Sequence, residues 1–374
     1  MQMKSARSIR VFTIISVGTL ALSAISALAF GTVSASINKI DAFAGITDRP
    51  GKASSAVNYL IVGSDTREGL TKEELAQLRV GSVKSAAGKR SDTMLLVHIS
   101  KARDKAVIIS IPRDTYALIP EHKNAQGKLI PAKHSKINSA FNWGGAPLLI
   151  QVLEDMTDLK IDHYVEVNFA GFADVVDALG GIEVCTKKDI NDPKSHLVLP
   201  AGVHTLNGIE ALKYVRTREF DGLGDIGRMQ RQQAFISSVL RKATSAGVLL
   251  NPITMVNFIN SSLSAVITDS GLDSSDLITL AKQMKSLSTS KVRTLTVPLS
   301  NLYYNQNGVT ASVLWDPVLA PELWLRLKED RAVIDEVSPS PSPSASTSAS
   351  SASTAEPTII DKFKTKTAAD DPCK

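Results

Sequence analysis

The chain has 374 residues, 43% of them hydrophobic, which is enough for a sizeable core and one membrane segment. Its formal net charge of +5 is only mildly basic, and no basic stripe is interleaved with aromatic residues, so nucleic acid is not an expected partner. The sequence also lacks the phosphate-binding loop, zinc-protease and serine-hydrolase motifs, so these enzyme classes receive little support.

The N-terminus has the pattern of a membrane anchor. Residues 1–10 carry Lys4, Arg7 and Arg10, and the uncharged apolar stretch 11–33 is long enough to span a bilayer as a helix. Positive charge before this stretch and none directly after it predict a single-pass protein of the cell membrane, with a cytoplasmic N-terminus and an extracellular remainder. The alternative is a cleaved signal peptide, because Ala27-Leu-Ala29 resembles a cleavage site, but the length of the stretch favours an uncleaved anchor.

Residues 34–56 are small, polar and punctuated by Gly and Pro, which predicts a linker. The regular elements that follow are predicted in this order: strands 59–63, 93–100 and 106–112, helix 148–156, strand 164–168, helix 169–179, strand 182–185, helices 208–215, 228–243, 256–263 and 274–287, strand 292–297 and helix 321–328. This mixture predicts an α/β fold over residues 57–335, a three-layer domain with a central mixed sheet flanked by helices. Residues 336–374 form a Ser/Pro-rich tail that is predicted to be disordered.

Two cysteines, Cys185 and Cys373, lie in the part predicted to be extracellular. An oxidising compartment would allow them to form a disulfide. Cys373 lies at the end of the predicted disordered tail, so the sequence gives no reason to pair the two cysteines and leaves the question of a disulfide undecided.

Four arginines flank a glycine-rich loop. They are Arg216, Arg218, Arg228 and Arg231, around Gly222, Gly224 and Gly227. Arginine is always charged and its planar fork of donors matches phosphate oxygens, and a helix that begins near the second pair adds backbone N–H groups and a partial positive charge. The cluster therefore favours a phosphate or pyrophosphate ligand. The alternative, a solvated basic face, is what most such clusters are when taken alone.

Charged residues also stand at the ends of the first three predicted strands. Asp65 follows the first strand, Asp92 precedes the second, and Arg113 and Asp114 follow the third. If these ends meet at one edge of the sheet, the two carboxylates of Asp65 and Asp92 suit Mg²⁺, which prefers oxygen ligands and shares its shell with substrate phosphates. The alternative for each motif by itself is a turn or a cap. Lys136, which precedes a Gly-Gly turn, is a further candidate, with an exposed lysine as the alternative.

Taken together, these segments resemble the LytR-CpsA-Psr family of membrane-anchored cell-wall glycopolymer transferases, of the actinobacterial type. The resemblance runs in order over residues 57–240 through Tyr59-Leu-Ile-Val-Gly-Ser-Asp-Thr-Arg, Arg90-Ser-Asp-Thr-Met, Ser110-Ile-Pro-Arg-Asp-Thr, Lys136-Ile-Asn-Ser-Ala-Phe, His163-Tyr-Val-Glu-Val-Asn-Phe, Leu206-Asn-Gly-Ile-Glu-Ala-Leu-Lys-Tyr-Val-Arg-Thr-Arg and Gly227-Arg-Met-Gln-Arg-Gln-Gln.

The resemblance implies a polyprenyl-pyrophosphate-linked glycopolymer as donor and a peptidoglycan hydroxyl as acceptor. The polymer would move with one phosphate and leave polyprenyl phosphate behind, and the lipid would lie in an apolar groove between sheet and helices. The implied roles are Mg²⁺ binding by Asp65 and Asp92, and pyrophosphate binding by Arg113, Lys136, Arg216, Arg218, Arg228 and Gln232. Asp65, Asp92, Arg113, Arg216 and Arg218 would form the catalytic set.

Three points remain open from the sequence. The general base is Asp65, Asp92 or Asp114. A phosphohydrolase acting on the lipid pyrophosphate would use the same cluster of residues. A non-catalytic wall-binding or regulatory protein is the alternative from another class, and it would tolerate the loss of Arg216 or Asp92.

Overall fold

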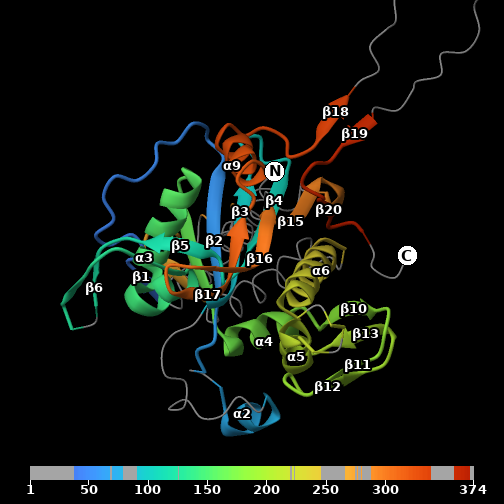
Figure 1. Ribbon diagram of the computed structural model, residues 1–374. Coiled ribbons are helices and arrows are strands. Elements are labelled where there is room, and N and C mark those ends of the chain that lie inside the picture. Colours follow the sequence, from blue (N-terminus) through green and yellow to red (C-terminus); the bar gives the residue numbers. More distant parts are fainter. Residues whose placement is uncertain are drawn as a thin grey trace, which may run out of the picture.

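The computed structural model describes residues 38–67, 70–78, 91–124, 126–219, 221–222, 224–245, 266–273, 276, 279, 288–337 and 358–370. Eight strands form its central sheet (Figure 1). In spatial order they are β1 (Asn38–Ile40), β14 (Val266–Asp269), β9 (His163–Val167), β2 (Val57–Ser64), β3 (Ser91–Ile99), β4 (Ala106–Ile111), β15 (Val292–Thr296) and β20 (Lys366–Thr367).

The sheet is mixed, as the sequence predicts. Strands β2, β3 and β4 are antiparallel neighbours, whereas β2 pairs parallel with β9, and β4 pairs parallel with β15. All six residues of β4 are buried, because helices cover both faces of the sheet. Alternate residues along β2 and β3 therefore belong to two different clusters, Leu60 and Leu96 to one and Ile61 and Val97 to the other.

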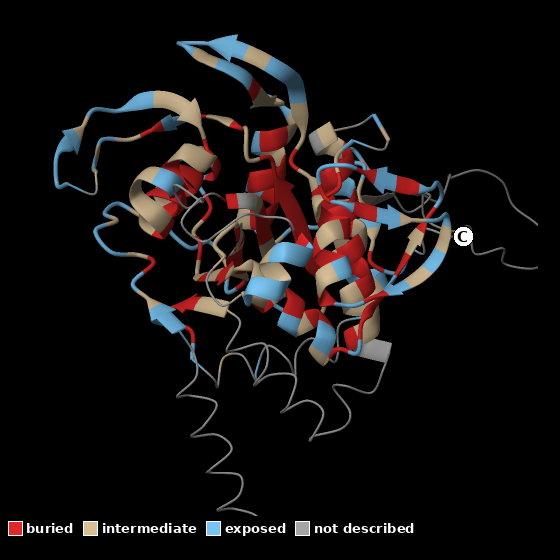
Figure 2. Ribbon diagram, turned by 90° about the horizontal axis from the view of Figure 1, so that it is seen from below, coloured by how far each residue is buried: buried red, intermediate tan, exposed pale blue. Residues whose placement is uncertain are grey.

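The first face is covered by α3 (Asn138–Thr157) and α9 (Leu319–Lys328), which pack in the larger core cluster. The second face is covered by α4 (Phe169–Ala178), α5 (Gly208–Arg216) and α6 (Gly224–Ser245). Figure 2 shows the buried residues gathered where these helices face the sheet. The three-layer arrangement is thus confirmed.

Smaller elements surround these layers. They are α2 (Lys72–Leu78), the β10–β13 pair (Ile182–Thr186 with Gly202–Leu206), the β11–β12 pair (Ile190–Asp192 with Leu197–Leu199), the β5–β8 pair (Tyr116–Ile119 with Lys133–Lys136), the β6–β7 pair (His122–Lys123 with Leu129–Ile130), the η2 turn (Thr289–Lys291) and the β16–β17 hairpin (Leu299–Gln306 with Val309–Trp315). The hairpin was missed by the sequence analysis. Its two-residue turn, Asn307-Gly308, has positive φ at both positions, so an Asn-Gly signal was present in the sequence.

The chain after the predicted catalytic domain differs from the expectation. A disordered tail was predicted from residue 336, but β18 (Asp335–Val337) pairs with β19 (Thr358–Ile360), and β20 joins the edge of the central sheet. Phe363 is buried in the main core and Ala368 is fully buried. The prediction of disorder was wrong for 358–370. It was based on the polar average composition of the segment, in which these few apolar residues carry little weight. Residues 338–357 lie outside the described residues.

The predicted linker also packs in part. From residue 38 onward it contributes β1, which pairs with β14, and Arg49, which forms an ion pair of 2.6 Å with the buried Glu154 of α3. The predicted membrane anchor, 11–33, lies outside the described residues, as does the predicted helix 256–263. Within the described ranges, no helix has the length and apolarity needed to cross a bilayer.

Cys185 on β10 is disulfide-bonded. The only other cysteine of the sequence is Cys373, which lies outside the described residues. Pairing within the chain is therefore limited to Cys373.

Candidate functional site

An apolar groove lies between the second face of the sheet and α4, α5 and α6. Its volume is about 560 Å³, and its walls combine side chains of β2, β3 and β4 with side chains of the three helices. The groove runs along the strands. At the end where β2 stops and β3 begins, its lining becomes polar and includes Arg216, Arg228 and Gln232.

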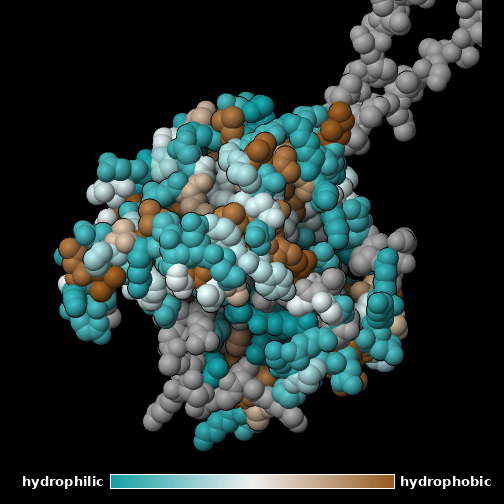
Figure 3. Space-filling model, viewed as in Figure 1, coloured by the Kyte–Doolittle hydropathy of each residue, from teal (hydrophilic) through white to brown (hydrophobic). Residues whose placement is uncertain are grey.

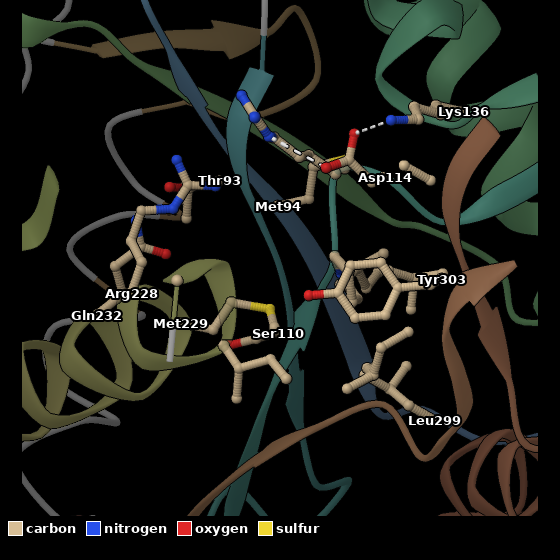
Figure 4. A pocket seen from close by; sticks show the side chains of 18 of the residues that line it. Thr93, Met94, Ser110, Asp114, Lys136, Arg228, Met229, Gln232, Leu299 and Tyr303 are labelled. Atoms are coloured by element: carbon tan, nitrogen blue, oxygen red, sulfur yellow. Dashed lines mark ion pairs between the residues drawn. The ribbon is translucent and has the colours of Figure 1, made fainter. Parts of the chain in front are cut away.

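A second, charged cavity of about 310 Å³ opens at that polar end. Asp114 and Lys136 lie on one side of it, and Arg228 and Gln232 lie on the other (Figure 4); Arg113 also lines it. In the space-filling view, hydrophilic residues gather below the β16–β17 hairpin (Figure 3). The groove and the cavity share Thr93, Leu95, Arg228 and Gln232 as lining residues, so the apolar and the charged space meet at the start of α6.

Asp114 joins two of the predicted phosphate-binding residues. Lys136 Nζ lies 3.2 Å from its Oδ1 and Arg113 Nε lies 3.6 Å from its Oδ2. The β5–β8 register pairs Tyr116 with Lys136 and thereby places this lysine beside the segment that follows β4. The structure therefore brings Arg113, Asp114 and Lys136 together at one wall of the cavity.

The opposite wall is the first turns of α6. Arg228 is only 3% exposed although it carries a permanent charge. Gln232 donates to the Val215 carbonyl at 3.2 Å, and Gln233 donates to Ser110 Oγ and Thr296 Oγ1, both at 3.0 Å. These bonds fix α6 against α5, β4 and β15. Gln233, which was not singled out in the sequence, thus positions the helix that carries Arg228.

The other arginines of the cluster divide between two roles. Arg216 lines the groove, with its guanidinium carbon 5.0 Å from the centre of the Phe169 ring. Arg231 forms an ion pair with Asp221 and donates to the Thr217 carbonyl at 2.6 Å. It therefore ties the glycine-rich loop to the start of α6. Arg218 lines neither the groove nor the cavity. The arginines therefore do not form one continuous ligand wall.

The loop that carries Arg218 is held by Asp192, a buried residue at the end of β11 that the sequence analysis missed. Its carboxylate accepts hydrogen bonds from the backbone N–H groups of Lys194, Ser195, Arg218 and Glu219. Burial by itself would raise the pKa of Asp192, but these donors outweigh burial and lower the pKa below its usual value.

Asp192→Asn is expected to destabilise the fold by about 1–3 kcal/mol at neutral pH, because an amide offers fewer acceptors to four N–H donors. Since the folded pKa lies below the unfolded value of 3.8, the contribution of Asp192 is present above that value and is lost as the pH falls through the folded pKa. Urea unfolding at several pH values measures the difference between the two proteins. A difference that grows toward low pH would contradict this assignment.

Asp65 and Asp92 lie at the same edge of the sheet. In the β2–β3 register Gly63 pairs with Thr93 and Ser64 pairs with Ser91, so Asp92 is the extra residue of a bulge between these two pairs, and Asp65 follows Ser64 just beyond the end of β2. Ser91 is fully buried, and its hydroxyl has no hydrogen-bond partner among the described residues. The side chain of Asp92 lies outside the described part of the structure.

The backbone thus brings two aspartates near one end of the β2–β3 pair, and carboxylate oxygens are ligands that Mg²⁺ prefers. Over the described ranges, no group of three or more His, Cys, Asp or Glu side chains forms a complete protein cage.

The fold and the site define a class: an α/β domain with a cationic cavity at the mouth of an apolar groove, suited to an amphiphile with an anionic headgroup. The LytR_cpsA_psr family model matches residues 28–315, and the chain belongs to this family.

Relatives agree with the assignment. The probable cell wall biosynthesis protein LcpB of Corynebacterium glutamicum is 35% identical over 78% of this chain, and the match spans 65% of that protein, less than two thirds of its length. The polyisoprenyl-teichoic acid–peptidoglycan teichoic acid transferase TagT of Bacillus subtilis is 37% identical, over 52% of this chain and 55% of TagT. A structure of TagT bound to LIIa-WTA superposes with a TM-score of 0.55 at 28% identity, over 77% of this chain and 95% of that one.

Proposed function

We propose that this domain transfers a glycopolymer phosphate from a polyprenyl-pyrophosphate-linked donor to a hydroxyl of peptidoglycan. The observation that carries the proposal is the junction of the apolar groove and the charged cavity at Arg228 and Gln232. A polyprenyl chain needs an apolar space and its pyrophosphate needs fixed cations. The junction supplies both side by side. The name of the relative TagT, a polyisoprenyl-teichoic acid–peptidoglycan teichoic acid transferase, supports the same donor and acceptor classes.

The charged residues then have defined tasks. Arg216 and Arg228 bind the phosphate nearer the lipid at the mouth of the groove, and Arg113 and Lys136 bind the phosphate that carries the polymer. Transfer breaks the P–O bond to the lipid phosphate and forms a P–O bond to the acceptor oxygen. Such reactions depend mainly on positioning and charge neutralisation. Gln232, whose side chain is fixed by its hydrogen bond to the Val215 carbonyl, lies between the two phosphate positions.

The proton of the acceptor hydroxyl passes to a carboxylate. Asp65 and Asp114 are the two candidates from the sequence whose side chains the structure describes, and of these Asp114 lines the cavity, so we assign it this role. Mg²⁺ at Asp65 and Asp92, when bound, supplies positive charge to the pyrophosphate oxygens. We propose that the domain acts at the outer face of the cell membrane, where both the lipid-linked donor and peptidoglycan are present.

The extent of the cavity favours transfer over hydrolysis. It continues past Asp114 to Leu302 and Tyr303 of the β16–β17 hairpin, whereas water as acceptor needs no such space. A non-catalytic binding protein would likewise need no carboxylate among the phosphate-binding cations.

Val97→Trp tests the place of the lipid. Val97 lines the groove four positions along β3 from Thr93, roughly 13 Å from the mouth. The larger ring should raise KM about tenfold or more for a long-chain donor, because the distal apolar surface can no longer be buried. A donor whose tail ends before Val97 should be affected much less.

Val198→Trp is the matched control, because Val198 is 74% exposed on β12 and lines neither space. KM is measured with donors of graded prenyl length. Equal losses for short and long donors in Val97→Trp would argue against the groove as the lipid site.

A further inference from the structure

We propose that the β16–β17 hairpin is a docking platform for the acceptor glycan, with Tyr303 as its stacking residue. This inference rests on the proposed function and adds to it the place where the second substrate binds. The occupant is a saccharide chain of the cell wall that presents one hydroxyl to the charged cavity.

Tyr303 is 79% exposed, yet it lines the cavity together with Leu302. Its ring stands across the cavity from Arg228 and Gln232, and its hydroxyl points inward (Figure 4). An aromatic ring with a polar tip matches a pyranose, which has an apolar C–H face edged by hydroxyl groups. Tyr303 contributes little to packing, and with Leu302, which is also exposed, it presents apolar surface to the polar cavity, where such a ligand can stack.

The neighbouring side chains hold the hairpin in one position. Tyr304, on the opposite face of the strand, meets the Tyr116 ring edge-on at 5.1 Å, and Tyr116 is stacked on His134 at 4.9 Å. At the turn, Asn307 donates to the Tyr116 hydroxyl at 2.7 Å. The platform is therefore fixed to β5 and β8, the same pair that carries Lys136.

The hairpin is also bonded directly to the segment of the proposed proton acceptor. The backbone N–H of Val313 donates to the Asp114 carbonyl at 2.8 Å, and the Trp315 indole N–H donates to Thr115 Oγ1 at 3.1 Å. A glycan stacked on Tyr303 therefore lies on the same rigid unit as the Asp114 carboxylate. This arrangement fixes the distance between the sugar and its proton acceptor.

The acceptor, rather than the polymer of the donor, is the occupant that the geometry favours. In phosphoryl transfer the attacking and leaving oxygens are roughly in line. The leaving lipid phosphate lies at the groove, on the Arg228 side, and the hairpin lies across the cavity from it. The attacking hydroxyl must therefore approach from the side of Tyr303.

The test measures binding of soluble peptidoglycan oligomers to the full-length protein in detergent, by calorimetry. A glycan-free polyprenyl pyrophosphate saturates the groove during the measurement. The wild type should bind the oligomers under these conditions, and Tyr303→Ala should weaken binding about tenfold through loss of the stacking surface. Tyr303→Phe, which keeps the ring, should restore most of the affinity, and Gln306→Ala, an exposed position on the same strand, should bind as the wild type does.

In the transfer reaction, Tyr303→Ala should raise KM for the acceptor far more than KM for the donor. Wild-type affinity of Tyr303→Ala for the oligomers would overturn the platform. A selective loss of affinity for the glycan-bearing donor, relative to the glycan-free lipid, would also overturn it, by placing the donor polymer on Tyr303. Oligomer binding that depends on Tyr303 in a protein without transfer activity would leave the platform standing and refute the proposed function instead.

Discussion

Replacing Arg228 with alanine is expected to lower kcat/KM for transfer by about 10²–10³-fold, the loss usual for a fixed donor to transition-state charge in a water-poor site. Arg228 is 3% exposed and lines both the groove and the cavity. Its guanidinium is therefore held in place before the substrate arrives. The effect should appear in kcat as well as in KM, because negative charge on the lipid phosphate grows as the bond breaks.

Two variants make this result interpretable. Arg228→Lys keeps the charge but loses the planar fork, so it should recover only part of the activity. Arg331→Ala removes a surface arginine that forms an ion pair with the exposed Glu329 and lines neither the groove nor the cavity, so it should have no effect on transfer. Steady-state rates and thermal unfolding are measured for all three proteins. Full activity of a folded Arg228→Ala protein would refute the assignment of the headgroup to this junction.

Removing divalent cations, or replacing Asp92 with asparagine, is expected to reduce transfer by about 10²-fold or more, because the cation neutralises charge on the pyrophosphate. Asp65 follows the Ser64–Ser91 pair on β2, and Asp92 is the bulged residue next to the same pair on β3, so both belong to one end of these two strands. Asp65→Asn should therefore behave in the same way. Added Mg²⁺ should restore the wild type fully and the variants only at higher concentrations.

A binding measurement separates this effect from a general loss of activity. Calorimetric titration of Mg²⁺ into protein with bound lipid pyrophosphate should show one site in the wild type and a weakened site in Asp92→Asn. Asp104→Asn is the control, because Asp104 lies at the opposite end of the β3–β4 hairpin, where it accepts a local hydrogen bond from Ser100. Mg²⁺ affinity that is equal in wild type and Asp92→Asn would place the cation elsewhere.

Local patterns in the sequence predicted the central part of the fold. The apolar runs before Asp65, around Leu96 and before Arg113 were predicted as strands, and they are neighbouring strands of one sheet. The sequence pattern also pointed to Arg113, Lys136 and Arg228, and the family resemblance pointed to Gln232; the structure places all four around one cavity, and their binding roles stay predictions. The strand predictions succeeded because adjacent antiparallel strands leave few alternatives for where their ends lie.

Contacts between distant segments were not predictable in this way. Asp192 holds the Arg218 loop from another small sheet, and its position in the sequence reads only as the end of a polar turn. Phe363 joins the core through a segment whose composition is mostly polar. The Asn307-Gly308 signal was readable, but nothing local indicated that its hairpin would meet the segment of Asp114. Pairings of this kind depend on the tertiary structure rather than on propensity.

The measurement that tests the central claim most directly is product analysis of one reaction. The full-length protein in detergent is incubated with Mg²⁺, a polyprenyl-pyrophosphate glycan labelled in its sugar, and peptidoglycan oligomers. We expect label joined to the oligomers through a phosphodiester, with one polyprenyl phosphate released for each new bond and no transfer by Arg228→Ala. Release of free glycan phosphate with no labelled oligomer, at saturating acceptor, would contradict the transferase and identify a phosphohydrolase.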